Sequence, residues 1–278
     1  MGDARAFGLI AGGGRLPFLV AEGARHAGFK VICVGFEGSV DPQLAGSVDV
    51  FYTVSVARLG VWIRKLRRHC VSDTAMVGRI DKTKLFTRWR IIKNLPDWRI
   101  LRVFYWRLRG KSLNTDLLLS AVADELATGG IIVTDSTVYC KEHLASEGVL
   151  THSQPSSETY ENIERGWTIA KKLGELDIGQ AVIVKEKEVI AVEAIEGTAE
   201  MIKRAGRFCP AGGWVLVKTS KPNQDMRFDV PCIGPDTIKG IAEFGGRCVV
   251  VEANKTIIID KPDTLELANK LGITIVAR

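Results

Sequence analysis

The segment 218–237, which reads KTSKPNQDMRFDVPCIGPDT, carries residue types suited to the chemistry of a diphosphate. Lys218, Lys221 and Arg227 alternate there with the carboxylates Asp225 and Asp229, and glycine and proline interrupt regular structure. Cations can hold phosphate oxygens, while a carboxylate can bind Mg²⁺ or orient a water molecule. An exposed loop with ordinary ion pairs explains the same residues, so both interpretations stay open at this point.

A second candidate site is the glycine-rich segment GLIAGGGRLP near the N-terminus. Gly12, Gly13 and Gly14 stand where an expected strand meets an expected helix, and backbone amides at a helix N-terminus suit phosphate or another anion. The glycine pattern of dinucleotide-binding sites is matched only in part, because Pro17 replaces its third glycine. Glu37, after the next strand, would be the ribose-binding acid of such a site. A ligand-free tight turn and an NAD(P)-dependent oxidoreductase are therefore alternatives.

A third candidate is VEAIEGTAEMI, in which Glu193 and Glu196 lie between an expected strand and an expected helix. Gly197 and Thr198 follow these carboxylates directly. Thr198 is a suitable N-cap residue, and the sequence predicts that it caps the helix. A helix cap alone accounts for this pattern without a ligand.

Positive charge is concentrated in one part of the chain. The whole chain carries a net charge of +6, yet residues 79–111 hold eleven Lys and Arg against two Asp, so the remainder is net negative. Aromatic residues interleave with these charges. If 98–109 is helical, Arg99 and Arg102 lie opposite its apolar face. The excess charge is local and needs a local explanation.

A cationic face backed by aromatic residues is typical of proteins that dock on anionic lipids. We therefore expect docking on an anionic membrane surface through Arg99, Arg102, Trp98 and Trp106. Nucleic acid attracts the same charges, and a solvated basic helix needs no partner at all. We expect no nucleic-acid partner.

The elements that must position these residues alternate between strands and helices in the first half of the chain. This alternation favours an α/β fold with a Rossmann-like parallel sheet in an N-terminal domain, residues 1–140. The polar, turn-rich stretch 141–157 is expected to be a linker. Residues 158–278, with a predicted hairpin at 181–194, are expected to form a mixed α/β C-terminal catalytic domain.

Composition narrows the class of protein. The chain has 278 residues, 46% of them hydrophobic and 25% charged, as in ordinary globular proteins of two domains. No apolar run approaches the ~18 residues of a membrane span, and no export signal is recognisable, so a cytoplasmic location is expected. The six cysteines and four histidines show no spacing of a zinc or dinuclear metal site.

Three segments together resemble a known family. GLIAGGGRLP, LDIGQAVIVKEKEVIAVEAIEGTAEMI and KTSKPNQDMRFDVPCIGPDTI, in this order, resemble the UDP-2,3-diacylglucosamine pyrophosphatase family of lipid A biosynthesis, in its two-domain form rather than the calcineurin-like one. The resemblance implies a Rossmann-like domain joined to a second α/β domain with the lipid substrate in a cleft between them. It also implies hydrolysis of a diacylated UDP-sugar lipid, UDP-2,3-diacylglucosamine, to 2,3-diacylglucosamine 1-phosphate (lipid X) and UMP. Mg²⁺-assisted attack of water on the β-phosphorus is implied as well.

The resemblance also implies roles for single residues. Asp229 matches the family's essential aspartate, which would act as a metal ligand or as a general base. Lys221 matches a second position that is expected to be catalytic. The expected substrate-binding residues are Gly12, Gly13, Gly14, Gly78, Asp116, Glu193, Glu196, Gly197, Thr198, Gln224 and Arg227. The chain departs from the family where an acidic pair opens a helix, because it reads Asn114-Thr115-Asp116 there and keeps only the last acid.

Two further expectations concern partners. The protein is expected to associate peripherally with the inner membrane, where its substrate resides, and a homodimer is considered. A non-catalytic lipid or nucleotide-sugar sensor on the same scaffold is the main alternative to the enzyme. Such a sensor would bind its ligand and release it unchanged.

Overall fold

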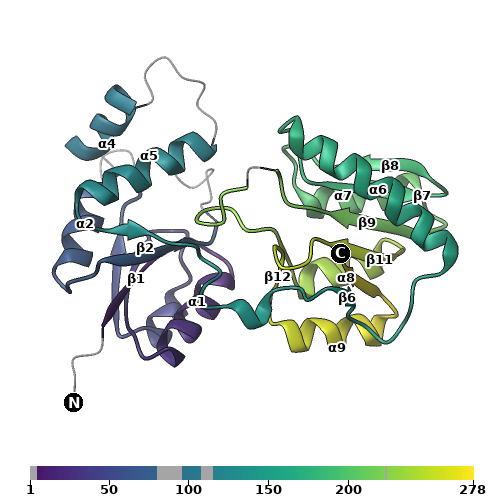
Figure 1. Cartoon of the computed structure of the whole chain (residues 1–278), viewed down its shortest axis with the longest axis horizontal. Helices are drawn as coiled ribbons and strands as arrows, with labels where there is room; N and C mark the ends of the chain where they lie inside the picture. Colours follow the sequence, from purple (N-terminus) through teal and green to yellow (C-terminus); the bar gives the residue numbers. More distant parts are fainter. Residues whose placement is uncertain (1–4, 80–95, 108–114, 223) are drawn as a thin grey trace. The chain divides into compact units, whose positions relative to one another are not determined.

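The computed structural model describes residues 5–79, 96–107, 115–222 and 224–278. The chain divides into two compact units (Figure 1). Unit 1 comprises Met1–Cys140 and, in addition, the short segment Asp225–Asp229. Unit 2 comprises Lys141–Gln224 and Val230–Arg278. Asp225–Asp229, expected within a continuous C-terminal domain, thus belongs with unit 1 by its contacts.

Unit 1 is built on a parallel sheet of five strands, in the order β3-β2-β1-β4-β5. Its strands are β1 (Ala6–Ala11), β2 (Lys30–Phe36), β3 (Val50–Val54), β4 (Asp73–Val77) and β5 (Ile132–Val133). Its helical elements are α1 (Leu16–His26), η1 (Pro42–Ser47), α2 (Leu59–Arg67), α4 (Trp98–Arg102), the π-helical turn η2 (Val103–Arg107) and α5 (Thr115–Thr128). The α/β fold with a parallel N-terminal sheet is confirmed.

Alternation along the strands of unit 1 produces two apolar faces. Ile10, Ile32 and Val34 pack in one core with helices α2 and α5. Their neighbours Leu9 and Val31 are equally buried and point to the opposite face, since successive strand residues alternate. Helix α1 lies on the other side of the sheet from α2 (Figure 1). A sheet covered on both faces explains why its strands are apolar throughout.

Unit 2 is built on a mixed sheet of six strands, in the order β6-β13-β11-β9-β7-β8. These strands are β6 (Gly148–Val149), β7 (Ala181–Lys185), β8 (Glu188–Val192), β9 (Trp214–Lys218), β11 (Gly246–Val251) and β13 (Thr274–Ala277). Two short strands, β10 (Cys232–Ile233) and β12 (Ile257–Ile258), pair parallel and form a separate two-stranded sheet. The helical elements are η3 (Lys141–His143), α6 (Ser157–Glu175), α7 (Thr198–Phe208), α8 (Pro235–Glu243) and α9 (Lys261–Leu271).

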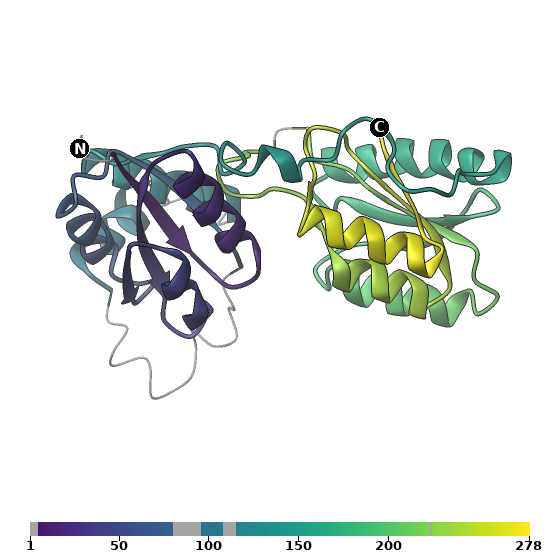
Figure 2. The same ribbon diagram turned by 90° about the horizontal axis from the view of Figure 1, so that it is seen from below.

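The sheet of unit 2 is also covered on both faces. Helix α6 packs on Val182, Val184 and their neighbours, while helices α7, α8 and α9 pack on the alternate residues, such as Ile183. Figure 2 shows α6 on one side of this sheet and the yellow helix α9 with its neighbours on the other. The expected hairpin is present, since β7 and β8 pair antiparallel.

Two segments differ from expectation. The stretch 141–157, expected as a linker, contributes strand β6, which pairs antiparallel with β13. The helix considered over 98–109 ends at Arg102 and continues as the π-helical turn η2. None of the helices in the described ranges has the length and hydropathy to cross a bilayer.

Close main-chain packing joins the ends of β1 and β4. The Gly12 amide donates to the Val77 carbonyl at 2.8 Å, and the Gly13 amide donates to the Arg79 carbonyl at 2.8 Å. A Cβ at Gly12 would lie 2.5 Å from the Arg79 oxygen. Gly78 has φ +92°, a left-handed conformation that side chains disfavour. These glycines are therefore needed for the fold, whatever else they do.

Replacing Gly12 by alanine should destabilise unit 1, because backbone atoms must move to admit the methyl group. We expect a loss of about 1–3 kcal/mol in the free energy of unfolding. Gly46→Ala is the matched control, since no atom lies within 4 Å of a Cβ built there. Urea unfolding of the two variants and the parent measures the difference. Equal midpoints for Gly12→Ala and Gly46→Ala would contradict the packing argument.

Candidate functional site

The carboxyl edge of the unit 1 sheet is where an α/β sheet of this order binds ligands, because its winding reverses between β1 and β4. The glycine segment lies at this point. The amides of Gly12 and Gly13 already donate within the fold. Gly14 has φ +97° and open space where a side chain would be. Of the three predicted anion-binding glycines, Gly14 is thus the one whose amide has no hydrogen-bond partner in the described part of the chain.

The segment Asp225–Asp229 belongs to the same edge. The Met226 carbonyl accepts hydrogen bonds from the Ser136 amide at 3.3 Å and from its hydroxyl at 2.8 Å, and Ser136 follows β5 by three residues. Phe228 packs on the core that contains α2 and α5. Parallel strands have their carboxyl ends at one edge of the sheet. This segment and the glycine turn, formed by Gly12, Gly13 and Gly14, therefore lie at the same end of the sheet. Asp229, predicted to be catalytic, closes the segment.

Two charges within this segment are paired with one another. Nε of Arg227 donates to both oxygens of Asp225, at 3.0 and 3.1 Å, and Nη2 donates at 2.7 Å. The Arg227 hydrogen bond lowers the pKa of Asp225, and the same pairing raises the pKa of Arg227. The Asp229 amide donates to the Asp225 carbonyl at 3.1 Å, which closes a turn. Arg227, expected to bind substrate, is therefore held in an ion pair with Asp225.

Unit 2 contains a buried polar cluster between β8, α7 and β9. Glu193 and Lys218 are each 7% exposed. The Thr198 hydroxyl donates to Glu193 Oε1 at 2.5 Å, and Lys218 Nζ donates to the same hydroxyl at 3.2 Å and to the Cys232 carbonyl at 3.1 Å. Glu193 Oε2 is buried and has no hydrogen-bond partner among the described residues. The cluster holds a carboxylate with one acceptor still available.

The prediction that Thr198 caps helix α7 is wrong. Gly197, with φ +83°, is the N-cap residue, and Thr198 is the first residue of the helix. The Thr198 hydroxyl is therefore used by Glu193 rather than by a backbone amide. Glu196 accepts from the Ala194 amide at 3.2 Å and forms an ion pair with Arg204 at 2.8 Å. These contacts fix the loop that carries both predicted glutamates.

Lys221 and Gln224 occupy one turn after β9. The Lys221 amide donates to Gln224 Oε1 at 2.7 Å, and the Gln224 amide donates back to the Lys221 carbonyl at 3.1 Å. Lys221 Nζ forms an ion pair with Asp177 at 2.5 Å, where the carboxylate is more than half exposed. Such a solvated pair is weak, so a phosphate can replace Asp177 at small cost.

Sequence analysis missed a buried carboxylate that holds the start of this turn. The Ser220 amide and hydroxyl donate to Glu252 Oε2 at 2.8 and 2.6 Å, and Lys171 Nζ donates to the same oxygen at 2.6 Å. Lys255 binds the other oxygen at 2.8 Å. Despite desolvation, these bonds lower the Glu252 pKa to about 2. Lys171 and Ser220 are far from Glu252 in sequence, so no local spacing signals these two contacts.

Two of the four predicted docking residues, Arg99 and Arg102, contact a buried carboxylate. Arg99 donates to Glu125 at 2.8 Å and to the Thr128 hydroxyl at 3.0 Å, and Arg102 lies 3.8 Å from the same carboxylate. The Glu125 side chain is fully buried, so both arginines serve first to neutralise it. Trp98 is 73% exposed. Trp106 lies in η2 and Asp116 in the first turn of α5, and the side chains of both are outside the described residues.

The described residues can be examined for a site that could bind the expected Mg²⁺. No group of three or more His, Cys, Asp or Glu side chains comes together within the described ranges. Mg²⁺ usually binds through one or two carboxylates together with substrate phosphates, rather than in a cage of protein ligands. A carboxylate such as Asp229, on the segment at the sheet edge, fits such a site by its donor chemistry.

Comparison with known proteins agrees with this architecture. The LpxI N-terminal domain model matches residues 6–143, and the LpxI C-terminal domain model matches residues 146–276. The chain is 30% identical over 277 residues to the UDP-2,3-diacylglucosamine pyrophosphatase LpxI of Caulobacter vibrioides, covering 97% of this chain and 96% of that protein. These matches place the chain among two-domain α/β enzymes that hydrolyse a pyrophosphate bond. It belongs to the LpxI family.

Replacing Glu252 by glutamine should lower stability in a pH-dependent way. The native pKa of about 2 lies below the ordinary value of 4.5, so the carboxylate stabilises the fold above pH 4.5 and loses this effect as the pH falls towards 2. We expect a loss of about 2–3 kcal/mol in unfolding free energy at pH 7, shrinking below pH 4.5. Glu200→Gln, in an exposed pair with Lys203, is the control and should change little. A pH-independent effect of Glu252→Gln would refute the assignment.

Proposed function

We propose that this enzyme hydrolyses UDP-2,3-diacylglucosamine to 2,3-diacylglucosamine 1-phosphate and UMP. The observation that carries the proposal is the match over nearly the full length of a relative with that printed activity. The position of the Asp225–Asp229 segment at the carboxyl edge of the unit 1 sheet, where sheets of this order bind ligands, supports it independently.

The proposed reaction breaks the bond between the bridging oxygen and the β-phosphorus. Water adds to the β-phosphorus, its oxygen stays on the sugar 1-phosphate, and UMP leaves with the bridging oxygen. The proton lost by water must reach a base. Asp229 is the carboxylate that we assign either to accept this proton or to hold Mg²⁺. When bound, Mg²⁺ would neutralise charge on the diphosphate.

Cations and a carboxylate other than Asp229 would bind and orient the diphosphate. Lys221 can exchange its exposed partner Asp177 for a phosphate oxygen. Arg227 is kept in place by its bonds to Asp225 and can donate its remaining N–H groups to a phosphate oxygen. In unit 2, the unpartnered oxygen of Glu193 can accept a hydrogen bond from a hydroxyl or amide of the substrate. Fixed donors and acceptors of this kind cost no reorganisation during the reaction.

Two acyl chains on the substrate require access to a bilayer. We therefore infer peripheral association with the inner membrane rather than insertion. Electrostatic attraction to anionic lipids and burial of exposed aromatic side chains would provide it.

Replacing Asp229 by alanine should lower kcat by at least about 10²-fold, because the reaction loses its base or its metal ligand. The unfolding midpoint should stay close to that of the parent. Asp263→Ala, at an exposed position in the first turn of α9, is the control and should retain kcat. Hydrolysis by the parent in ¹⁸O-labelled water should place the label in the sugar 1-phosphate.

Two outcomes would overturn parts of this proposal. Label in UMP would move the attack to the α-phosphorus. Binding of the UDP-lipid without turnover, at any Mg²⁺ concentration, would make the protein a lipid sensor.

A further inference from the structure

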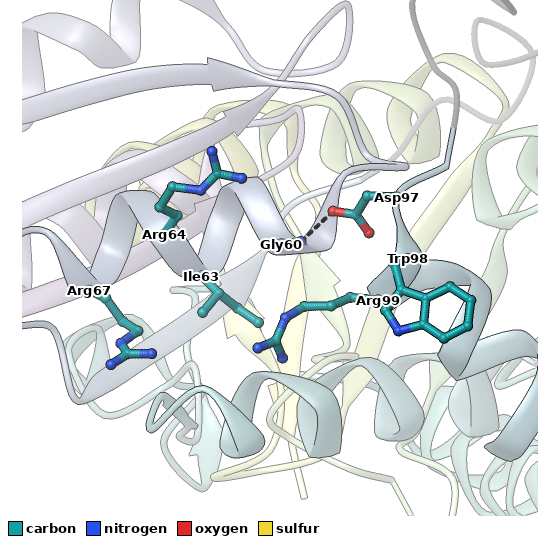
Figure 3. A pocket seen from close by; sticks show the side chains of 7 residues that line it. All are labelled: Gly60, Ile63, Arg64, Arg67, Asp97, Trp98 and Arg99. Carbon is teal, nitrogen blue, oxygen red and sulfur yellow. Dashed lines mark hydrogen bonds between the residues drawn. The ribbon is translucent and has the colours of Figure 1, made fainter.

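A pocket of about 500 Å³ lies between α2 and α4 of unit 1 (Figure 3). Helix α2 supplies Arg64 and Arg67, and the facing segment supplies Trp98 and Arg99, as Figure 3 shows. The pocket is lined by Gly60, Ile63, Arg64, Arg67, Asp97, Trp98 and Arg99. Neither the glycine turn nor Asp229 contributes to this lining.

The carboxylates of Asp97 and Glu125, near this pocket, already have hydrogen-bond or ion-pair partners within the protein. Asp97 accepts hydrogen bonds from the Gly60 amide at 2.6 Å and from the Ile100 amide at 3.0 Å, so its carboxylate joins the start of α4 to the start of α2. Glu125 is bound by Arg99. Arg64 and Arg67 have no ion-pair or side-chain hydrogen-bond partner in the described part of the chain. Among the described residues, no carboxylate therefore neutralises the guanidinium groups of these two arginines.

Apolar side chains stand exposed beside these charges. Trp98, Leu101, Phe104 and Tyr105 are 73%, 46%, 45% and 57% exposed. The inward positions of the same segment, Ile100 and Val103, are buried. The segment thus has one face in the core and a second apolar face in solvent, and such faces mark interaction sites.

We propose that this pocket binds the phosphate headgroup of an anionic phospholipid, and that the exposed face of 98–105 enters the bilayer beside it. Guanidinium groups match phosphate, and an aliphatic side chain among aromatic ones favours acyl chains over nucleic-acid bases. The inference deepens the proposed function, since an enzyme acting on a diacylated lipid must reach a membrane. The sequence analysis expected Arg99 and Arg102 to contact anionic lipid, but these two arginines bind Glu125. In this proposal Arg64 and Arg67 contact the lipid phosphate instead.

The test is binding to vesicles of phosphatidylglycerol and phosphatidylcholine, compared with phosphatidylcholine alone. Arg64→Gln/Arg67→Gln should weaken binding to the anionic vesicles about 10- to 30-fold, and added salt should reduce the difference. Arg165→Gln/Lys172→Gln removes two exposed charges from α6 of unit 2 and is the matched control, with less than about 2-fold change expected. Leu101→Ser/Phe104→Ser should weaken binding at low and at high salt.

Two results would overturn the docking proposal. One is the absence of parent binding to anionic vesicles, and the other is equal binding by Arg64→Gln/Arg67→Gln and its control. Binding of single-stranded DNA in place of vesicles would assign the surface to nucleic acid instead. Turnover of substrate in neutral detergent micelles separates the two proposals. Arg64→Gln/Arg67→Gln should keep the parent kcat there, whereas a parent inactive in micelles contradicts the proposed function alone.

Discussion

The close approach of β1 and β4 at their carboxyl ends is the constraint on which the rest of unit 1 depends. Gly12 and Gly13 bond to main-chain atoms of the neighbouring strand, and no side chain fits between them. The chain then turns into α1 at the point where the sheet reverses its winding. The segment Asp225–Asp229 is fixed at the same edge by Ser136 and by its own phenylalanine. Asp229, the carboxylate proposed to be catalytic, lies on a segment that is thereby held by a rigid sheet.

Buried carboxylates decide where many of the positive charges go. Glu125 forms ion pairs with Arg99 and Arg102, and Glu252 forms ion pairs with Lys171 and Lys255. A buried charge without such partners would be strongly destabilising, so these cations are not available for a ligand. The net charge of a segment is therefore a poor measure of its binding capacity. Cations that are not held by a buried carboxylate are the ones that can bind a phosphate.

The two units contribute different chemistry to one proposed reaction. Unit 1 offers the glycine turn, Asp229 and an amphipathic surface with two arginines that have no ion-pair partner among the described residues. Unit 2 offers a buried glutamate with an unsatisfied oxygen and a lysine turn fixed through Glu252. A diphosphate that carries both a nucleoside and acyl chains needs polar, cationic and apolar contacts together. The family to which the chain belongs is consistent with that combination.

Local sequence determined the elements and the family. Strand and helix periodicity, the glycine-rich turn and the motifs around Glu193 and Asp229 depend on neighbours within a few residues, so they can be read without a structure. Pairing between distant residues was decided only by the tertiary structure. Thr198 bonds to Glu193 instead of capping its helix, Arg99 is used by Glu125, and Ser220 meets Glu252 across 32 positions. Which partner a side chain binds depends on the distances between atoms in the folded chain, and these distances cannot be derived from the spacing of residues in the sequence.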